Sequence, residues 1–262
     1  MNPSRPAVAP TRRFTREIPV RHVVDVCVAG GGPAGVAAAV AAAREGARVF
    51  LAEGQGCLGG MGTAGLVPGF MPFGDGIHTL AAGIGTEVLE RMLAVCGRRP
   101  GDTTDYRLRG EYGIDAEALK RVYDDLVRDA GVDFAFFTHL VDAEREGDRL
   151  QAGVFWGKSG IFAVEAAVWI DATGDGDLAF LAGAPCEQGD AEGRMMPGTL
   201  CSRWTHVDFE QAVADGLRWG HGAHVEQAWK DGVLPVCDRH LSGVWPVRGD
   251  LVGGNIGHTF GV

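Results

Sequence analysis

The stretch from Val23 to Glu53 constrains the fold of this chain more than any other part of the sequence. It contains an apolar run rich in β-branched residues, a turn that fits G-x-G-x-x-G, an alanine-rich segment, and a second apolar run that closes on an acid. This order predicts a buried strand over 23–29, a helix that ends at Arg44, and a second strand over 48–52. Such a unit is typical of a parallel sheet that binds a dinucleotide.

Each glycine of the turn meets a separate requirement. Gly30 allows the tight turn, Gly32 lets backbone N–H groups approach a pyrophosphate, and Gly35 lets the helix and strand pack closely. The phosphates would face a helix N-terminus, where unpaired N–H groups and the helix dipole favour negative charge. Glu53 can accept hydrogen bonds from both hydroxyls of an adenosine ribose and would repel a 2′-phosphate. The alternative is the same αβ unit without a ligand.

Composition limits the partners and the compartment. The formal net charge of −10 argues against a nucleic-acid surface or an anionic membrane as a partner. Six cysteines lie far apart with no C-x-x-C pair, which predicts a reduced, cytoplasmic protein. Cys27 falls inside the first predicted strand, where we expect a small buried hydrophobe. Arg12-Arg13 is not followed by a hydrophobic segment, and the longest apolar run, 34–43, is too short to span a bilayer. We expect residues 1–20 to form a flexible tail.

A glycine-rich stretch over 54–76 follows the acid directly. It could be a loop packed on itself. The interpretation we favour is a loop laid along an extended cofactor, because it begins directly after the ribose-binding acid. Beyond it, the apolar periodicity predicts helices over 83–96 and 113–130, the second with Asp115 as its N-cap.

Three strand-like runs come next, over 132–143, 150–156 and 161–170, joined by short turns that indicate an antiparallel meander. The third continues into a fresh buried strand over 167–172, which ends in a second glycine turn at Gly174. Open α/β sheets bind ligands at the carboxyl ends of their strands. The predicted fold class is therefore α/β, a Rossmann-like parallel sheet with an antiparallel β-meander and the start of a second domain.

Three motifs together resemble the FAD-dependent oxidoreductases of the glutathione-reductase-like superfamily. They are the G-x-G-x-x-G unit, C-L-G-G-M-x-T over 57–63, and I-D-A-T-G-D-G-D over 170–177. The resemblance runs from about residue 18 to about residue 205. It implies FAD as the cofactor and a flavin that exchanges a hydride with a substrate. It does not identify the substrate.

The resemblance also implies binding roles at matching positions. Gly59 and Gly60 would offer N–H groups, and Thr63 a hydroxyl, on the phosphate-to-flavin side. Leu140, in a strand over 138–141, would pair with the adenine edge through its backbone. The remaining positions are the pyrophosphate-binding Gly30, Gly32, Pro33, Ala34 and Gly35, the ribose-binding Glu53, and Thr173, Gly174 and Asp175 beside the pyrophosphate and ribityl chain. Asp175 should face hydroxyls, because two anions in contact would repel.

Two departures from the family pattern matter. Cys57 is followed five residues later by Gly62, so the C-x-x-x-x-C dithiol of the disulfide reductases is absent. Family members usually continue through a substrate domain and a C-terminal segment that returns to the flavin. We therefore expect this sequence to be C-terminally truncated, without part of the flavin site.

The region after Cys186 is less informative. The sequence predicts a tail over 1–20, an FAD-binding domain over 21–186 and a partial substrate domain over 187–262. Arg203 could hold an anionic substrate, although an arginine on a surface strand is the default reading. The isolated histidines invite two further readings. His78 could face the flavin, whereas His221-x-x-His224 has no evident third ligand, so we expect no metal.

The sequence thus predicts an FAD-dependent oxidoreductase that transfers a hydride between a small organic molecule and the flavin. One alternative is an NAD-dependent Rossmann oxidoreductase, against which the second glycine turn argues. Another is a non-catalytic or incomplete adenine-dinucleotide-binding fragment. The sequence assigns no catalytic residue, electron acceptor or oligomeric state.

Overall fold

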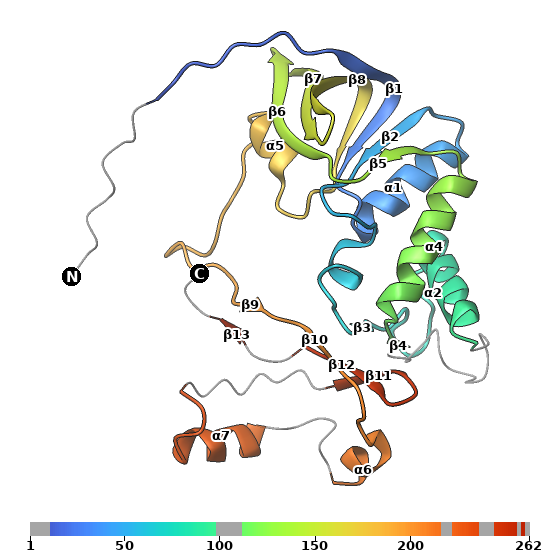
Figure 1. Ribbon diagram of the computed structural model, residues 1–262, viewed down its shortest axis with the longest axis vertical. Coiled ribbons are helices and arrows are strands. Elements are labelled where there is room, and N and C mark those ends of the chain that lie inside the picture. The colour runs from blue at the N-terminus through green and yellow to red at the C-terminus, as the bar shows by residue number, and fades with distance from the viewer. Residues whose placement is uncertain (1–10, 98–111, 216–221, 236–243, 256–257, 260–262) are drawn as a thin grey trace.

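A six-stranded sheet dominates the computed structural model, which describes residues 11–97, 112–215, 222–235, 244–255 and 258–259. The strand order is β5-β2-β1-β8-β7-β6 (Figure 1). The first four strands pair in parallel and the last two pair antiparallel, which confirms the predicted α/β class. The strands are β1 (Val20–Ala29), β2 (Val49–Ala52), β5 (Asp133–Ala135), β6 (His139–Glu146), β7 (Arg149–Gly157) and β8 (Gly160–Asp171).

Two of the predicted strand runs were wrong in detail. The run over 132–143 is two strands, because Phe137 adopts a left-handed conformation with φ of 50° and breaks it. Its first part, β5, pairs in parallel with β2 and so lies outside the meander. The predicted fresh strand over 167–172 is the continuation of β8, which pairs with β7 on one edge and with β1 on the other. It is also not fully buried, since Val168 is 52% exposed.

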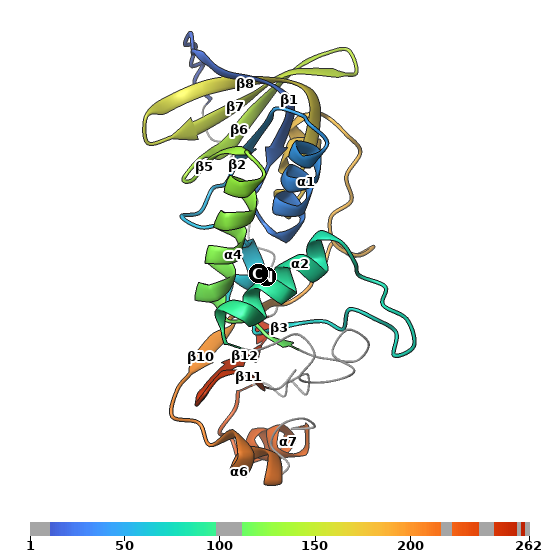
Figure 2. The same ribbon diagram turned by 90° about the vertical axis from the view of Figure 1, so that its right-hand side faces the viewer.

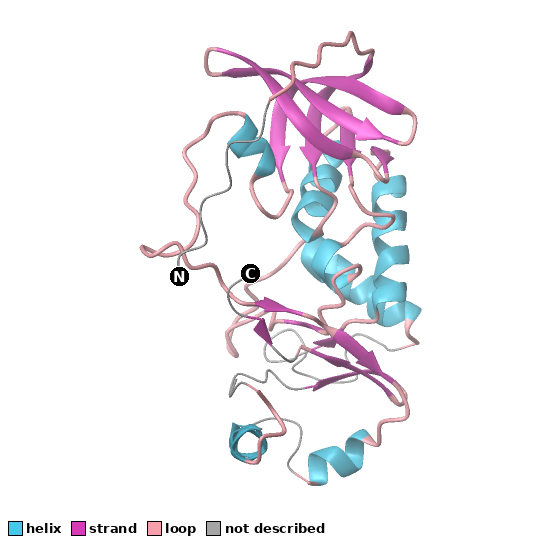
Figure 3. Ribbon diagram, turned by 60° about the vertical axis from the view of Figure 1, so that its left-hand side comes forward, coloured by secondary structure: helices cyan, strands magenta, loops and turns pink. Residues whose placement is uncertain are grey.

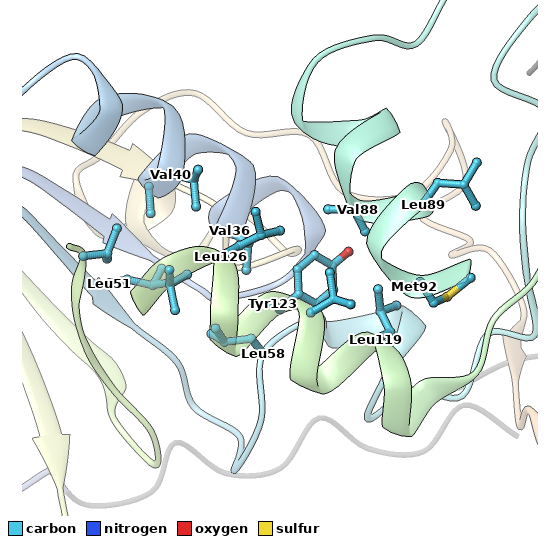
Figure 4. Packing of buried hydrophobic residues seen from close by; sticks show 14 of the residues in the cluster. Val36, Val40, Leu51, Leu58, Val88, Leu89, Met92, Leu119, Tyr123 and Leu126 are labelled. Atoms are coloured by element: carbon cyan, nitrogen blue, oxygen red, sulfur yellow. The ribbon is translucent and has the colours of Figure 1, made fainter. Parts of the chain in front are cut away.

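Two helices, α1 (Pro33–Arg44) and α4 (Ala116–Asp129), cover one face of the sheet, and α2 (Ile84–Val95) packs against both of them. Apolar side chains from α1, α2 and α4 meet β1 and β2 there in one cluster, because alternate strand residues point to the same face (Figure 4). Its fully buried members include Val28, Val36, Val40, Leu51, Leu58, Leu89, Leu119 and Leu126. The helices thereby fix the turns that lead into and out of them.

On the other face of the sheet, side chains of β1 and β2 pack against side chains of the antiparallel strands β7 and β8. Cys27 and Phe50 point to this side and lie in one cluster with Phe155 and Phe162. The rings of Phe50 and Phe155 meet edge to face at 6.3 Å between centroids. Burial raises the pKa of the Cys27 thiol to about 12. This confirms the prediction that Cys27 is a small buried hydrophobe, and none of the five cysteines in the described residues forms a disulfide.

A second, smaller unit follows α5 (Asp177–Leu181). This unit contains a small sheet of three strands, in the order β10 (Ser202–Trp204), β12 (Leu251–Gly254) and β11 (Val244–Arg248). Viewed from the side, the large sheet, the helices, the small sheet and the last helices follow one another along the molecule (Figures 2 and 3). The antiparallel pair of β3 (Gly69–Phe70) and β4 (Tyr112–Gly113) adjoins this unit. The division of the chain at residue 187 stays a prediction. The remaining elements are η1 (Gly60–Gly62), β9 (Gly198–Thr199), α6 (Phe209–Ala214), α7 (Gly222–Lys230) and β13 (His258–Thr259).

Candidate functional site

The two glycine turns lie side by side at one edge of the large sheet. Strands β1 and β8 are parallel neighbours in which Ala29 pairs with Asp171, so both end at the same level. The N–H of Ala172 donates to the carbonyl of Ala29 at 2.8 Å. A Cβ on Gly30 would lie only 2.2 Å from the carbonyl oxygen of Ala172. The structure therefore brings together the turns at residues 30–35 and 173–175, which lie about 140 positions apart in the chain.

The glycines of the first turn divide into two kinds. A Cβ on Gly35 would lie 1.8 Å from the carbonyl oxygen of Gly30, so Gly35 permits the close packing of helix on strand. Gly32 differs, because no atom lies within 4 Å of the place where its Cβ would be. It is the N-cap of α1 and makes no side-chain cap. Pro33 and Ala34 follow it, both exposed. The N-terminus of α1 thus has no side-chain cap and begins beside a position with open space.

Glu53 joins this turn to the loop after β2. It is 7% exposed, and its carboxylate accepts hydrogen bonds from the backbone N–H groups of Gly31 at 2.7 Å and Gln55 at 2.6 Å. A carboxylate has about four acceptor positions, so two remain for further donors. The sequence analysis missed the role of Gly31 because the motif leaves that position free.

The loop over 57–63 is folded against the first turn. The N–H of Gly59 donates to the carbonyl of Gly31 at 2.8 Å, and the hydroxyl of Thr63 donates to the carbonyl of Leu58 at 2.6 Å. Thr63 is 1% exposed. A Cβ on Gly60 would lie 3.2 Å from the Cα of Gly32, so Gly60 borders the open space of the first turn. Gly59 and Thr63 therefore build the loop, and their cofactor contacts stay a prediction.

Asp171 organises the second turn, a role that the sequence analysis missed. One carboxylate oxygen accepts from the N–H and hydroxyl of Thr173 at 3.0 and 2.8 Å, and the other accepts from the N–H of Ala179 at 2.9 Å. Burial raises the pKa of Asp171, but these hydrogen bonds outweigh it and hold the pKa below its ordinary value of 3.8. The pattern that could have predicted this role is an aspartate two residues before a threonine at a strand end, since such side chains form hydrogen bonds with the nearby backbone.

Gly174 and Asp175 lie exposed beyond this anchor. Gly174 has φ of 94°, and nothing lies within 4 Å of its Cβ position. This second open space lies in the turn beside that of Gly32. Thr173 cannot be equally free, because its hydroxyl accepts from the N–H of Asp177 at 2.9 Å in addition to bonding Asp171.

Leu140 is half-buried in the cluster around Phe155. The segment that leads into its strand is hydrogen-bonded to Glu53. The N–H of Thr138 donates to the carbonyl of Glu53 at 2.9 Å. His139 lies against Gly54, whose Cβ would be 2.8 Å from the imidazole Nδ1. The structure thus places Leu140 near Glu53, and the sequence analysis missed His139 as its neighbour.

The weaker candidates lie elsewhere. The side chain of His78 is 73% exposed, and its Nδ1 lies 3.4 Å from a carboxylate oxygen of Asp75. Both Nη atoms of Arg203 are enclosed and have no hydrogen-bond partner. His221 lies outside the described residues. Within those residues, no group of three or more His, Cys, Asp or Glu side chains could hold a metal ion.

These residues fit an extended adenine dinucleotide such as FAD. Gly32 and Gly174 each face open space, and the strands that lead to them end side by side at one sheet edge, which suits an elongated molecule. The uncapped α1 N-terminus offers N–H groups to phosphate, and Glu53 retains acceptor capacity for sugar hydroxyls. In the part of the chain that the structure describes, no helix has the length and apolar character to cross a bilayer.

Comparison with known proteins agrees with this geometry. A family model described as "FAD dependent oxidoreductase" matches residues 25–244. A comparison with curated proteins gives no match.

One solved structure supports the fold, and two others are similar to parts of the chain. The chondrochloren halogenase CndH from a myxobacterium is 17% identical with a TM-score of 0.51, over 89% of this chain and 53% of that one. The OxyS anhydrotetracycline hydroxylase from Streptomyces rimosus is 15% identical with a TM-score of 0.49, over 89% and 45%. THI4 from Thermovibrio ammonificans is 21% identical with a TM-score of 0.43, over 62% and 64%. The chain thus spans about half to two thirds of these proteins.

Proposed function

Because the chain belongs to the family of FAD dependent oxidoreductases, with FAD as its cofactor, we propose that it transfers a hydride between a small organic substrate and the flavin. The observation that best supports this proposal is the meeting of two open glycine turns beside the buried Glu53. An elongated nucleotide that lies along both turns would reach from a ribose site to the second turn.

The residues of this chain would bind and orient the cofactor. The first N–H groups of α1 would donate to its phosphates, and Glu53 would accept hydrogen bonds from the adenosine ribose. Asp171 would hold the second turn in place through Thr173 and Ala179, so that Gly174 can approach the ligand closely. Bound FAD supplies the hydride-transfer chemistry itself.

The first experiment tests the choice of cofactor. Purified protein, freed of bound nucleotide, is titrated with FAD, FMN and NAD⁺, and binding is followed by flavin absorbance or calorimetry. We expect FAD to bind at least about tenfold more tightly than either competitor, because only FAD presents both an adenosine and a flavin to the two turns. Comparable or tighter binding of NAD⁺ would identify the NAD-dependent alternative.

The second experiment tests the redox role. The FAD-loaded protein is screened anaerobically against small alcohols, amines and carboxylic acids, with loss of the oxidised flavin bands as the readout. Bleaching by one class of substrate supports the proposal. A protein that holds FAD, is bleached by dithionite and responds to no member of the panel would be a binding module instead.

A further inference from the structure

Arg203 belongs to the small sheet, and its side chain lies beside Pro68 of the loop before β3. It occupies the middle of β10, directly opposite Gly253 of β12. Its Nη1 is 3.1 Å from the position that a Cβ on Gly253 would take, and Cβ of Pro68 is 2.4 Å from the same point. The missing side chain of Gly253 therefore leaves the room that the guanidinium and Pro68 share. Pro68 belongs to the loop that continues from 57–63, so Arg203 lies beside the loop that leads away from the candidate cofactor site.

The guanidinium has no hydrogen-bond partner at its enclosed end. Both Nη1 and Nη2 are shielded from solvent and unpaired. Asp115 is the carboxylate whose charge acts on the guanidinium. One oxygen of Asp115 accepts from the N–H groups of Glu117 and Ala118, and the other lies 3.6 Å from Nε of Arg248. A shielded charge without an acceptor is strongly unfavourable, so the Nη atoms need an acceptor from outside the protein, either a water molecule or a bound anion.

Other arginines of the described chain show the contrast. Several arginines on the surface each form an ion pair with a carboxylate, although water could solvate them. The pairs are Arg44 with Glu87, Arg48 with Asp25, Arg91 with Glu87, Arg128 with Asp125 and Arg194 with Asp190. The arginine that most needs a carboxylate is thus left without a hydrogen-bonded one. Burial lowers the pKa of Arg203, which Asp115 opposes, and a bound anion would act in the same direction as Asp115.

We propose that Arg203 binds the carboxylate of the substrate, so that the substrate is a small organic acid. The planar guanidinium donates two parallel hydrogen bonds to a carboxylate, which a neutral amide cannot reproduce. Pro68, which packs beside the guanidinium, lies in a loop between η1 and β3, and the proposal requires that this loop shift to admit a small acid. The identification of the bound acid as the substrate rests on the proposed oxidoreductase function. The anion site itself does not depend on that function.

The test compares acids with their amides. Purified protein, with and without FAD, is titrated with sodium acetate and sodium benzoate, and with acetamide and benzamide at equal sodium chloride. Thermal unfolding reports binding in both forms, and the flavin difference spectrum reports it in the FAD-loaded form. We expect at least one acid to raise the unfolding temperature and perturb the flavin spectrum, and neither amide to do so.

Variants connect the effect to the side chain. Arg203→Gln should weaken acid binding at least about tenfold, and Arg203→Lys should weaken it less, because lysine keeps the charge but loses the fork. Arg149→Gln, at an exposed position of β7, should change nothing. Should Arg203→Gln fail to fold by circular dichroism, the lysine variant and the acid–amide contrast in the unaltered protein decide the question.

Several results would overturn the proposal. Equal binding of acid and amide, no binding of either acid, or unchanged acid binding in a folded Arg203→Gln variant would assign the enclosed guanidinium to ordered water. Acid binding without a flavin difference spectrum would place the anion away from the reaction and remove the substrate assignment. If FAD does not bind but acids bind through Arg203, the proposed function fails and the anion site stands.

Discussion

Helices α1 and α4 lie in one layer, but their N-termini differ: α4 has a side-chain cap and α1 has none. At α4, Asp115 caps the helix by accepting from the N–H groups of Glu117 and Ala118, both at 3.1 Å. At α1, the N-cap is Gly32, which has no side chain, and the first turn contains no acid. A side-chain cap stabilises a helix by about 1 kcal/mol, so α1 lacks a contribution that α4 has.

The difference shows where the chain leaves room for a ligand. The N-terminus of α4 satisfies its N–H groups from within the protein, and Asp115 also faces Arg248 at 3.6 Å. The N-terminus of α1 leaves them for an anion, beside a glycine with open space at its Cβ position. An absent cap is informative because caps are common and easily supplied by a single residue.

The largest effect should come from Gly35, which sets the position of α1. A Cβ there would lie 1.8 Å from the carbonyl oxygen of Gly30, and backbone atoms cannot yield without separating α1 from β1. We expect Gly35→Ala to lower the free energy of unfolding by about 3 kcal/mol or more. Urea denaturation followed by circular dichroism measures this. The matched control is Gly32→Ala, which meets no atom within 4 Å and should leave stability within about 0.5 kcal/mol. Equal stability of the two variants would contradict the division of the glycines.

Gly32→Asp should convert the α1 N-terminus into the α4 type. The backbone of Gly32, with φ of −66° and ψ of −176°, already has the extended conformation of an N-cap. We expect stability to rise by about 1 kcal/mol while FAD affinity falls about 100-fold, because the carboxylate takes the N–H groups and repels the phosphates. Urea denaturation and FAD titration measure the two quantities separately. Gly32→Asn caps without charge and should lose less affinity. A variant that binds FAD as tightly as the unaltered protein would place the phosphates elsewhere.

The sequence predicted the parts of this comparison that depend on neighbouring residues. The glycine turn, the start of α4 at Asp115 and the burial of Cys27 follow from local spacing and apolar pattern, and the structure contains all three. It also predicted that the turns at Gly32 and Gly174 bind one ligand, because open α/β sheets bind ligands at the carboxyl ends of their strands.

The parts that the sequence could not predict depend on distant contacts. The break at Phe137 requires a left-handed residue, which few non-glycine residues adopt. The continuity of β8 follows from its pairing with β1 along one edge and β7 along the other. The enclosure of Arg203 arises from Gly253 and Pro68, which lie far from it in the chain.

Asp115→Ala should remove the cap from α4 and make it resemble α1. We expect a loss of about 1 kcal/mol in the free energy of unfolding, because two N–H groups lose their acceptor. Asp115→Asn keeps an oxygen in place and should lose less. Chemical denaturation of both variants gives the comparison. FAD affinity should stay the same, since α4 caps itself and leaves nothing for the nucleotide, and a parallel loss of FAD binding would show that the two helix N-termini are not independent.

The smallest effect concerns a third helix start, that of α5, where Asp171 accepts from the N–H of Ala179 at 2.9 Å. The pKa of Asp171 lies below its ordinary value of 3.8, because hydrogen bonds to its charged form outweigh the effect of burial. Its ionised form therefore stabilises the folded state above about pH 4, and this contribution is lost as the pH falls through the lowered pKa. We expect Asp171→Asn to be less stable than the unaltered protein at pH 6, and the gap to narrow toward pH 3. Urea denaturation at pH 6, 5, 4 and 3 measures the gap, and Asp175→Asn, at an exposed neighbour, controls for general charge effects. A gap that stays constant over this range would mean that Asp171 anchors the second turn without its charge.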